Sequence, residues 1–286
     1  MNQPMDCCGA GDPRDLSVDQ ARERIATGLP SPAGIEQLPL RSALGRVLAE
    51  SVISPLDVPG QDNSAMDGYA VRSADLAADG ESRLQLIGTA LAGGAWDRVL
   101  EPGQCLRIMT GAVMPPGADS VIMQERAERK GDQVRIGPGH RVGENVRRAG
   151  EDIARGASVL PAGRRLRPAD LGLLASLGLA EVRVRRRLRV AFFSTGDELR
   201  SIGQPLEPGD VYDSNRYTLH GMLSRLGLEL LDLGVVRDQR GSLRQAFSDA
   251  AAIADVVITS GGVSVGEADY VKAILAELGE IGFWKI

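Results

Sequence analysis

The stretch that most constrains the fold runs from Ala254 to Asp269, where a short apolar segment enters a glycine turn and a helical pattern follows. Residues 256–260 are rich in Val and Ile, and Ser260-Gly261-Gly262 forms the turn. Buried parallel strands are continuous apolar runs, so residues 256–260 have the pattern of such a strand. The glycine turn then follows its carboxyl end, where a ligand can bind. The stretch therefore predicts a parallel-sheet domain with a binding site at one edge.

The rest of the C-terminal half alternates strand and helix patterns. We expect strands at 188–193, 229–236 and 256–260, with a last one from about residue 281, and helices at 214–226, 242–253 and 269–278. Strands alternating with helices of this length form a doubly wound parallel sheet with right-handed crossovers. The predicted class is therefore α/β for this half.

The N-terminal half is expected to be mixed, with a β-rich centre. A capping box of Ser17 and Gln20 predicts a helix at 17–29, and Pro168 and Gly178 bound another at 168–177. Between residues 51 and 152, short β-rich runs at 84–91, 105–109, 121–124 and 133–136 are separated by turn signals. An alternating, arginine-bearing segment at 181–190 predicts one strand with a solvated face, a polyanion site being the alternative.

Composition narrows the class of protein. The 286 residues are 43% hydrophobic, which allows two or more domains, and the apolar runs are far shorter than the ~20 residues of a membrane span. Three cysteines and two histidines argue against a disulfide framework, a zinc cage or a Ser-His-Asp triad. The net charge of −5 and 3% aromatic content argue against nucleic acid. We therefore expect a cytoplasmic protein that binds neither nucleic acid nor membrane.

Polar residues gather where the predicted parallel strands end, and ligands of open α/β sheets bind at that edge. They are Ser194, Thr195, Gly196, Asp197 and Glu198, then Arg237 and Asp238, then Ser260, Gly261, Gly262, Ser264 and Asp269. Glycine turns and helix starts suit an anion, which the carboxylates would repel unless a hard cation such as Mg²⁺ lay between them. Structural roles stay open, since Asp269 suits a helix N-cap and Asp197 a turn.

The β-rich half contains three more candidate loops. Residues 62–71 form a polar loop in which Asp67-Gly68 is also a common tight turn, and Thr110 precedes a glycine in a strand-to-turn segment. Residues 147–152 place two arginines beside Glu151 and Asp152, which suits either a salt-bridged loop or an oxyanion site.

Together these strings resemble the molybdopterin molybdenumtransferase family, which catalyses the last step of molybdenum cofactor synthesis. The resemblance rests on residues 62–72, 107–112, 147–153, 193–199, 237–238 and 259–270, and it covers about 15–286. It implies an elongated homodimer that takes adenylylated molybdopterin and molybdate, uses Mg²⁺ and releases AMP with the cofactor. It also implies contact with a molybdopterin adenylyltransferase and with molybdoenzyme maturation factors.

The resemblance also implies roles for individual residues. Asp67, Asp152, Thr110 and Lys285 fall on catalytic positions, and Glu198, Asp238 and Asp269 on the metal site. The segments 194–197 and 260–264 would bind the substrate. The family's site forms between subunits, with the β-rich module of one chain facing the α/β domain of the other.

Four regions are expected from these observations. They are a disordered tail at 1–14, a linker and dimerisation domain at 15–55 and 153–186, a β-rich domain at 56–152, and a molybdopterin-binding α/β domain at 187–286. Family members continue beyond residue 286, so we expect the α/β domain to be incomplete here. A non-catalytic dimeric pterin-binding scaffold, or an inactive fragment of the enzyme, is the alternative function.

Overall fold

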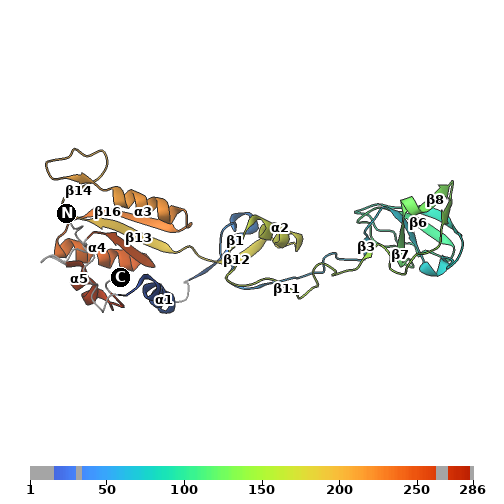
Figure 1. The fold of residues 1–286 in the computed structure, drawn as a ribbon, viewed down its shortest axis with the longest axis horizontal. Helices are drawn as coiled ribbons and strands as arrows, with labels where there is room; N and C mark the ends of the chain where they lie inside the picture. Colours follow the sequence, from blue (N-terminus) through green and yellow to red (C-terminus); the bar gives the residue numbers. More distant parts are fainter. Residues whose placement is uncertain (1–15, 30–33, 262–269, 284–286) are drawn as a thin grey trace, which may run out of the picture. The chain divides into compact units, whose positions relative to one another are not determined.

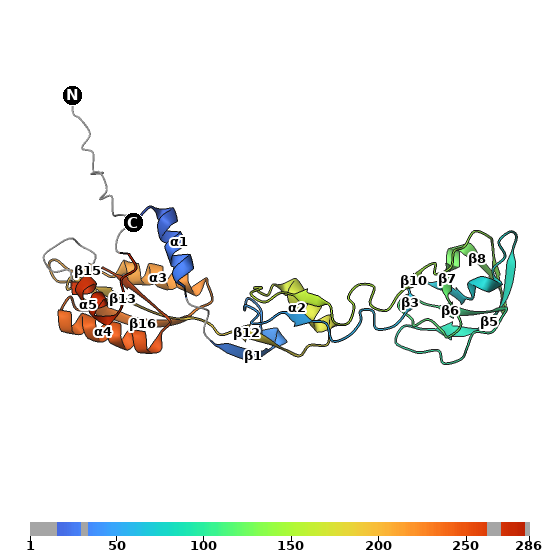
Figure 2. The same ribbon diagram turned by 90° about the horizontal axis from the view of Figure 1, so that it is seen from below.

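The computed structural model describes residues 16–29, 34–261 and 270–283. The chain divides into two compact units, one of Met1–Glu36 with Arg185–Ile286 and one of Gln37–Val184. Their elements are labelled in Figures 1 and 2. The predicted tail at 1–14 lies outside the described residues.

The β-rich part of the Gln37–Val184 unit is one six-stranded sheet, ordered β7-β4-β6-β5-β9-β8. Its strands are β4 (Gly68–Val71), β5 (Ser82–Ala90), β6 (Gln104–Ile108), β7 (Ser120–Met123), β8 (Ala127–Lys130) and β9 (Gln133–Ile136). All four residues of β4 are buried, and Tyr69 and Ala70 belong to different core clusters. Because successive side chains of a strand point to opposite faces, both faces of this central strand are covered. The expected β-rich module is confirmed.

Short ladders and one helix make up the rest of this unit. β2 (Val52–Ile53) pairs with β11 (Ser158–Leu160), and β3 (Asn63–Ser64) pairs with β10 (Val146–Arg147), both antiparallel. β1 (Ile35–Pro39) pairs with β12 (Glu181–Arg185), and α2 spans Pro168–Ser176. Leu48, Leu166, Leu174 and Val184 share a core cluster, so this part has a core of its own.

The α/β unit has a three-stranded parallel sheet ordered β16-β13-β17 (Figure 1). Its strands are β13 (Arg189–Thr195), β16 (Glu229–Val236) and β17 (Val256–Ser260). Its crossover helices are α3 (Ser214–Ser224) and α4 (Arg240–Ile253), and α5 (Tyr270–Leu278) follows the last strand. Phe192 packs with Leu223 of α3, whereas Phe193 packs with Phe247 of α4 and Ile274 of α5. Helices therefore cover both faces, which confirms the doubly wound arrangement.

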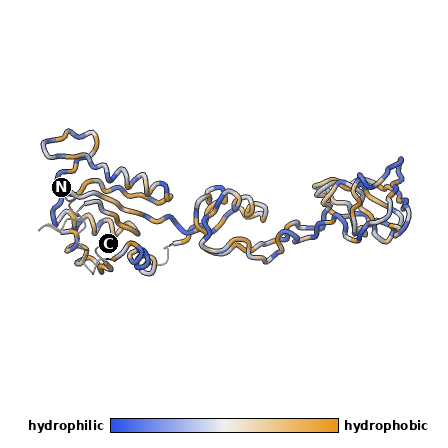
Figure 3. The backbone as a smooth tube through the Cα atoms, in the orientation of Figure 1, coloured by the Kyte–Doolittle hydropathy of each residue, from blue (hydrophilic) through white to orange (hydrophobic). Residues whose placement is uncertain are grey.

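Helix α1 (Val18–Gly28) begins with the predicted capping box, in which Ser17 and Gln20 each accept a hydrogen bond from the other's backbone. It is largely hydrophilic (Figure 3), and Ala21 is its buried residue. Arg24 donates a hydrogen bond to the carbonyl of Gly282 at 3.0 Å. No helix among the described residues is long and apolar enough to cross a membrane.

Two expectations about single elements need correction. The segment 181–190 is not one strand, because residues 186–188 separate β12 from β13. Arg186 there donates two hydrogen bonds to the carboxylate of Asp255, and its neighbour Arg189 pairs with Glu229. Residues 281–283 form no strand, and the remainder of that predicted element lies outside the described residues.

Candidate functional site

The carboxyl edge of the parallel sheet contains a point where the chain leaves neighbouring strands in opposite directions. β13 and β17 are paired, with Ser194 opposite Ser260. The chain after β13 leads to α3 on one face, whereas the chain after β17 leads to α5 on the other. Ligands of open α/β sheets bind at such a switch point, because the diverging loops leave a crevice. The described part of the predicted substrate loops, Ser194–Asp197 with Ser260 and Gly261, therefore lies where a ligand is expected.

Gly261 brings the two loops into contact. Its φ is +101°, and a Cβ at this position would lie 2.3 Å from the carbonyl oxygen of Thr195. Both the backbone conformation and the close approach require glycine. The turn predicted as a phosphate cradle is thus also a packing point between the ends of β13 and β17.

A cavity of about 200 Å³ opens beside this contact. It is lined by Thr195, Glu198, Leu199, Val211, Tyr212, Asp213, Ser214, Asn215, Ser260 and Gly261. Among the described residues, the buried hydroxyl oxygens of Thr195 and Thr259 have no hydrogen-bond partner. Thr195 lines the cavity, whereas Thr259 does not. Buried polar atoms are nearly always paired, so the unpaired hydroxyl of Thr195 suits a polar ligand that supplies the partner.

Ser194 is held inside the domain. Its hydroxyl donates a hydrogen bond to one carboxylate oxygen of Asp213 at 2.9 Å. That Asp213 oxygen also accepts a hydrogen bond from the amide of Arg216 at 3.1 Å, so Asp213 caps α3. Asp213, Ser214 and Asn215 line the cavity but were not predicted as site residues. The N-cap pattern before the helix at 214 was the signal that could have identified them.

Two of the three predicted metal ligands, Glu198 and Asp238, lie on the loops after β13 and β16. The amide of Asp238 donates to the carboxylate of Asp197 at 3.3 Å, and the carboxylate of Glu198 lies against Gly196. Carboxylate oxygens are the donors that Mg²⁺ prefers, so the chemistry of this set fits the ion. Within the described ranges, no group of three or more His, Cys, Asp or Glu is arranged to hold a metal. Asp269, Gly262, Ser264 and Lys285 lie outside those ranges.

A second, polar cavity of about 590 Å³ lies beside these loops. Its lining residues are Gly196, Asp197, Leu199, Arg200, Ser201, Gln204, Val235, Arg237 and Gln239. Arg200 is paired with Asp210 at 2.8 Å, which leaves Arg237 as the more available cation of the two. Residues 195–199 thus contribute to the lining of two cavities.

In the β-rich module, two predicted catalytic residues are in direct contact. The amide and the hydroxyl of Thr110 both donate to the same carboxylate oxygen of Asp67, each at 2.8 Å. The hydrogen bond from the amide is the larger cause, and that from the hydroxyl the next, of a pKa of Asp67 that is below its usual value. Asp67 is therefore an exposed, ionised carboxylate in a fixed orientation.

Asp152 lies on a loop rich in ion pairs. Arg147 donates to its carboxylate, which raises the pKa of Arg147, and Arg147 also lies 3.8 Å from Glu151. Arg148 pairs with Asp62 at 2.6 Å. Of the two structures that the sequence allowed here, the salt-bridged loop is the one observed.

Comparisons with known proteins agree with these features. A family profile described as the MoeA N-terminal region, domain I and II, matches residues 16–178, and one described as a probable molybdopterin binding domain matches 191–286. A molybdopterin molybdenumtransferase of Haemophilus influenzae is 46% identical over 272 residues, covering 95% of this chain and 67% of that protein. The chain belongs to the molybdopterin molybdenumtransferase, or MoeA, family.

Further relatives of this transferase family show the same likeness. A molybdopterin molybdenumtransferase of Nostoc is 45% identical over 254 residues, covering 88% of this chain and 58% of that protein. The crystal structure of a molybdopterin biosynthesis MoeA protein from Pyrococcus horikoshii matches with a TM-score of 0.83 and 36% identity, over 94% of this chain and 68% of that one. The chain thus spans between 58% and 67% of the length of the two curated relatives.

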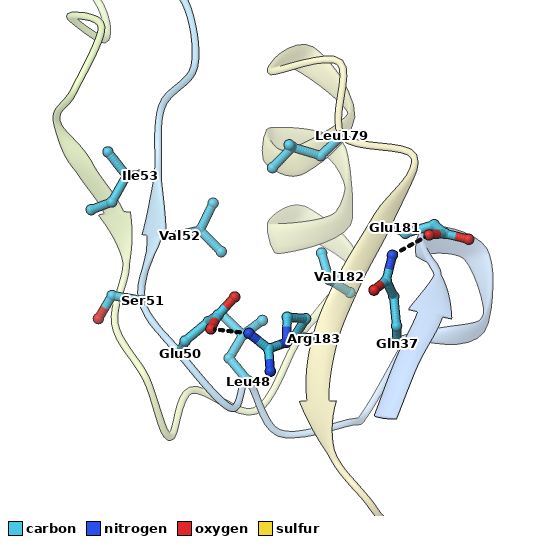
Figure 4. Close-up of a pocket in the computed structure, with 10 residues that line it drawn as sticks. All are labelled: Gln37, Leu48, Glu50, Ser51, Val52, Ile53, Leu179, Glu181, Val182 and Arg183. Carbon is cyan, nitrogen blue, oxygen red and sulfur yellow. Dashed lines mark hydrogen bonds and ion pairs between the residues drawn. The ribbon is translucent and has the colours of Figure 1, made fainter. Parts of the chain in front are cut away.

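A third cavity, of about 310 Å³, has no predicted site residue in its described lining (Figure 4). Its apolar part includes Leu48 and Val182, and Figure 4 shows Glu50 bonded to Arg183 and Gln37 to Glu181. Because Arg183 is already paired with Glu50, the described lining of this cavity offers no unpaired cation to an anionic substrate.

Proposed function

We propose that the protein transfers molybdenum from molybdate to adenylylated molybdopterin, with Mg²⁺-dependent release of AMP. Family membership supports the substrate class. The observation that carries the proposal is the crevice at the ends of β13 and β17, which is lined by Ser260, Gly261 and Thr195, and the Thr195 hydroxyl is buried without a partner in the described chain. A phosphate-bearing ligand would supply the hydrogen-bond acceptor that this hydroxyl lacks.

Each residue set has a separate task in this proposal. The loop at Ser260 and Gly261 binds the pterin phosphates through backbone amides. Glu198, Asp238 and Asp269 would hold Mg²⁺, which when bound neutralises negative charge on the phosphoanhydride. Asp67, kept ionised by Thr110, would orient groups at the reacting phosphate together with Asp152.

The assembly is also a proposal. We propose a cytoplasmic homodimer in which the β-rich module of one subunit completes the site on the α/β domain of the other. The substrate would arrive from a molybdopterin adenylyltransferase, and the product would pass to molybdoenzyme maturation factors. Mixing two inactive variants, one altered at Asp67 and one at Glu198, should restore activity if the site is shared between subunits.

The test is to mix the protein with adenylylated molybdopterin, Mg²⁺ and molybdate and to measure AMP. AMP should form only when all components are present, and Asp67→Asn should lower its rate about 100-fold. Tight binding of the pterin without any AMP would instead favour the alternative, a pterin-binding scaffold. An unchanged rate in Asp67→Asn would remove Asp67 from the machinery.

A further inference from the structure

The two-residue strand β3 connects the loops that carry Asp67, Thr110 and Asp152. On one side, Ser64 donates to the carbonyl of Ala112 at 3.0 Å and accepts from the amide of Gly111 at 2.8 Å. On the other side, β3 pairs with β10, which opens the Asp152 loop. Asp67 follows β3 by three residues. A change at β3 can therefore reach all three loops.

Asp62 immediately precedes this strand, and both of its carboxylate oxygens bind the Asp152 loop. One oxygen accepts from the guanidinium of Arg148 at 2.6 Å, and the other from the amide of Ala149 at 2.8 Å. The hydrogen bond from Ala149, followed by that from Arg148, lowers the pKa of Asp62. Hydrogen bonds to an ionised group are roughly twice as strong as neutral ones.

The turn between Arg147 and Asp152 is also held by ion pairs of Arg147, whose guanidinium contacts the carboxylates of Asp152 and Glu151. Arg147 is held by the β3–β10 ladder, and the amide of Asp152 donates to the carbonyl of Val58 at 2.9 Å. Between these two ends, Gly150 donates to the carbonyl of Pro59 at 2.9 Å, and Glu151 and Arg148 bond to each other within the turn. Asp62 supplies the two charge-assisted bonds that fix the turn to β3.

We propose that Asp62 is a positioning residue for Asp152. It acts through Arg148 and Ala149, and its ionised carboxylate sets the shape of the turn that presents Asp152. The role in catalysis rests on the proposed function, whereas the effect on the loop does not. Arg148 is the partner through which the same effect can be tested from the other side.

The experiment compares Asp62→Asn and Arg148→Gln with Glu81→Gln as the matched control. Glu81 makes an exposed ion pair with Arg135 between β5 and β9 and has no contact with the Asp152 loop. Hydrogen exchange of the amides at 149–152 should rise about tenfold in the first two variants and stay unchanged in the control. The double variant should exchange about as fast as Asp62→Asn alone, because the bond that Arg148→Gln removes is one of the two that Asp62 makes.

Kinetics give the second measurement. AMP release by Asp62→Asn and Arg148→Gln should show a kcat about tenfold lower with KM within about twofold, since positioning affects the reacting geometry more than binding. Unchanged exchange in both variants, or raised exchange with an unchanged kcat, would overturn the inference. If the wild-type protein releases no AMP, the proposed function fails, and exchange alone decides whether Asp62 holds the loop.

Discussion

The two groups of candidate residues differ in how their polar atoms are satisfied. In the β-rich module, Asp67 accepts two hydrogen bonds from Thr110, Asp152 pairs with Arg147, and Asp62 binds two donors of the neighbouring loop. At the carboxyl edge of the α/β sheet, the hydroxyls of Thr195 and Thr259 are buried, with no partner in the described chain.

This difference indicates a division of roles. Pairing fixes the orientation of a side chain before a ligand arrives, which is the property required of a group that acts on the reacting atoms. An unpaired buried hydroxyl costs about 1–3 kcal/mol, and a ligand that supplies its partner recovers that energy. We therefore infer that the β-rich loops position reacting groups and that the carboxyl edge of the sheet binds the substrate.

The largest effect should come from crowding the contact between the ends of β13 and β17. Gly261→Ala adds a Cβ 2.3 Å from the carbonyl oxygen of Thr195 at a φ of +101°. Strain and overpacking together should lower the free energy of unfolding of this domain by about 3 kcal/mol. Urea unfolding followed by circular dichroism measures the change.

Gly209→Ala is the matched control for this variant. Gly209 has a φ of +98°, but no atom lies within 4 Å of a Cβ built there. Its substitution should cost about 1 kcal/mol from backbone strain alone. Equal costs for the two variants would mean that the ends of β13 and β17 do not need their close contact.

A smaller effect, and one of opposite sign, should come from removing an unpaired hydroxyl. Thr195→Val should raise the free energy of unfolding by about 1 kcal/mol, because the free protein loses an unsatisfied polar atom, while binding of the pterin weakens. Thr110→Val, which removes a paired hydroxyl, should not stabilise the protein. If Thr195→Val destabilises the protein as well, the hydroxyl has a partner in solution and the contrast between the two regions fails.

Local signals in the sequence predicted much of the fold. The strands at 229–236 and 256–260 have the expected bounds, because buried parallel strands are continuous apolar runs. The capping box before α1 depends on residues three apart, so it too was visible. The two-residue strands β2, β3 and β10 were not predicted, since so short a ladder has no periodicity.

Long-range contacts account for what the sequence did not predict. In the alternating segment at 181–190, Arg186 occupies what would be an apolar position, and its pairing with Asp255, 69 residues away, coincides with the break between β12 and β13. Asp67 and Thr110 were identified as separate candidates, but their contact spans 43 residues. The Asp62–Arg148 pair, 86 residues apart, was missed for the same reason.

The smallest effect concerns Asp255 at the amino edge of the parallel sheet. Its carboxylate is hydrogen-bonded, unlike the hydroxyls of Thr195 and Thr259 at the carboxyl edge. Arg186, and then the amide of Arg189, lower the pKa of Asp255 to about 2. Because the folded pKa lies below the unfolded one, near 3.8, Asp255 stabilises the protein above about pH 4, and this stabilisation is lost as the pH falls towards 2. Asp255→Asn should therefore shift the urea midpoint downward at pH 7 and leave it close to the wild-type value near pH 2. A difference that persists unchanged at low pH would show that the charge of Asp255 is not what stabilises this edge.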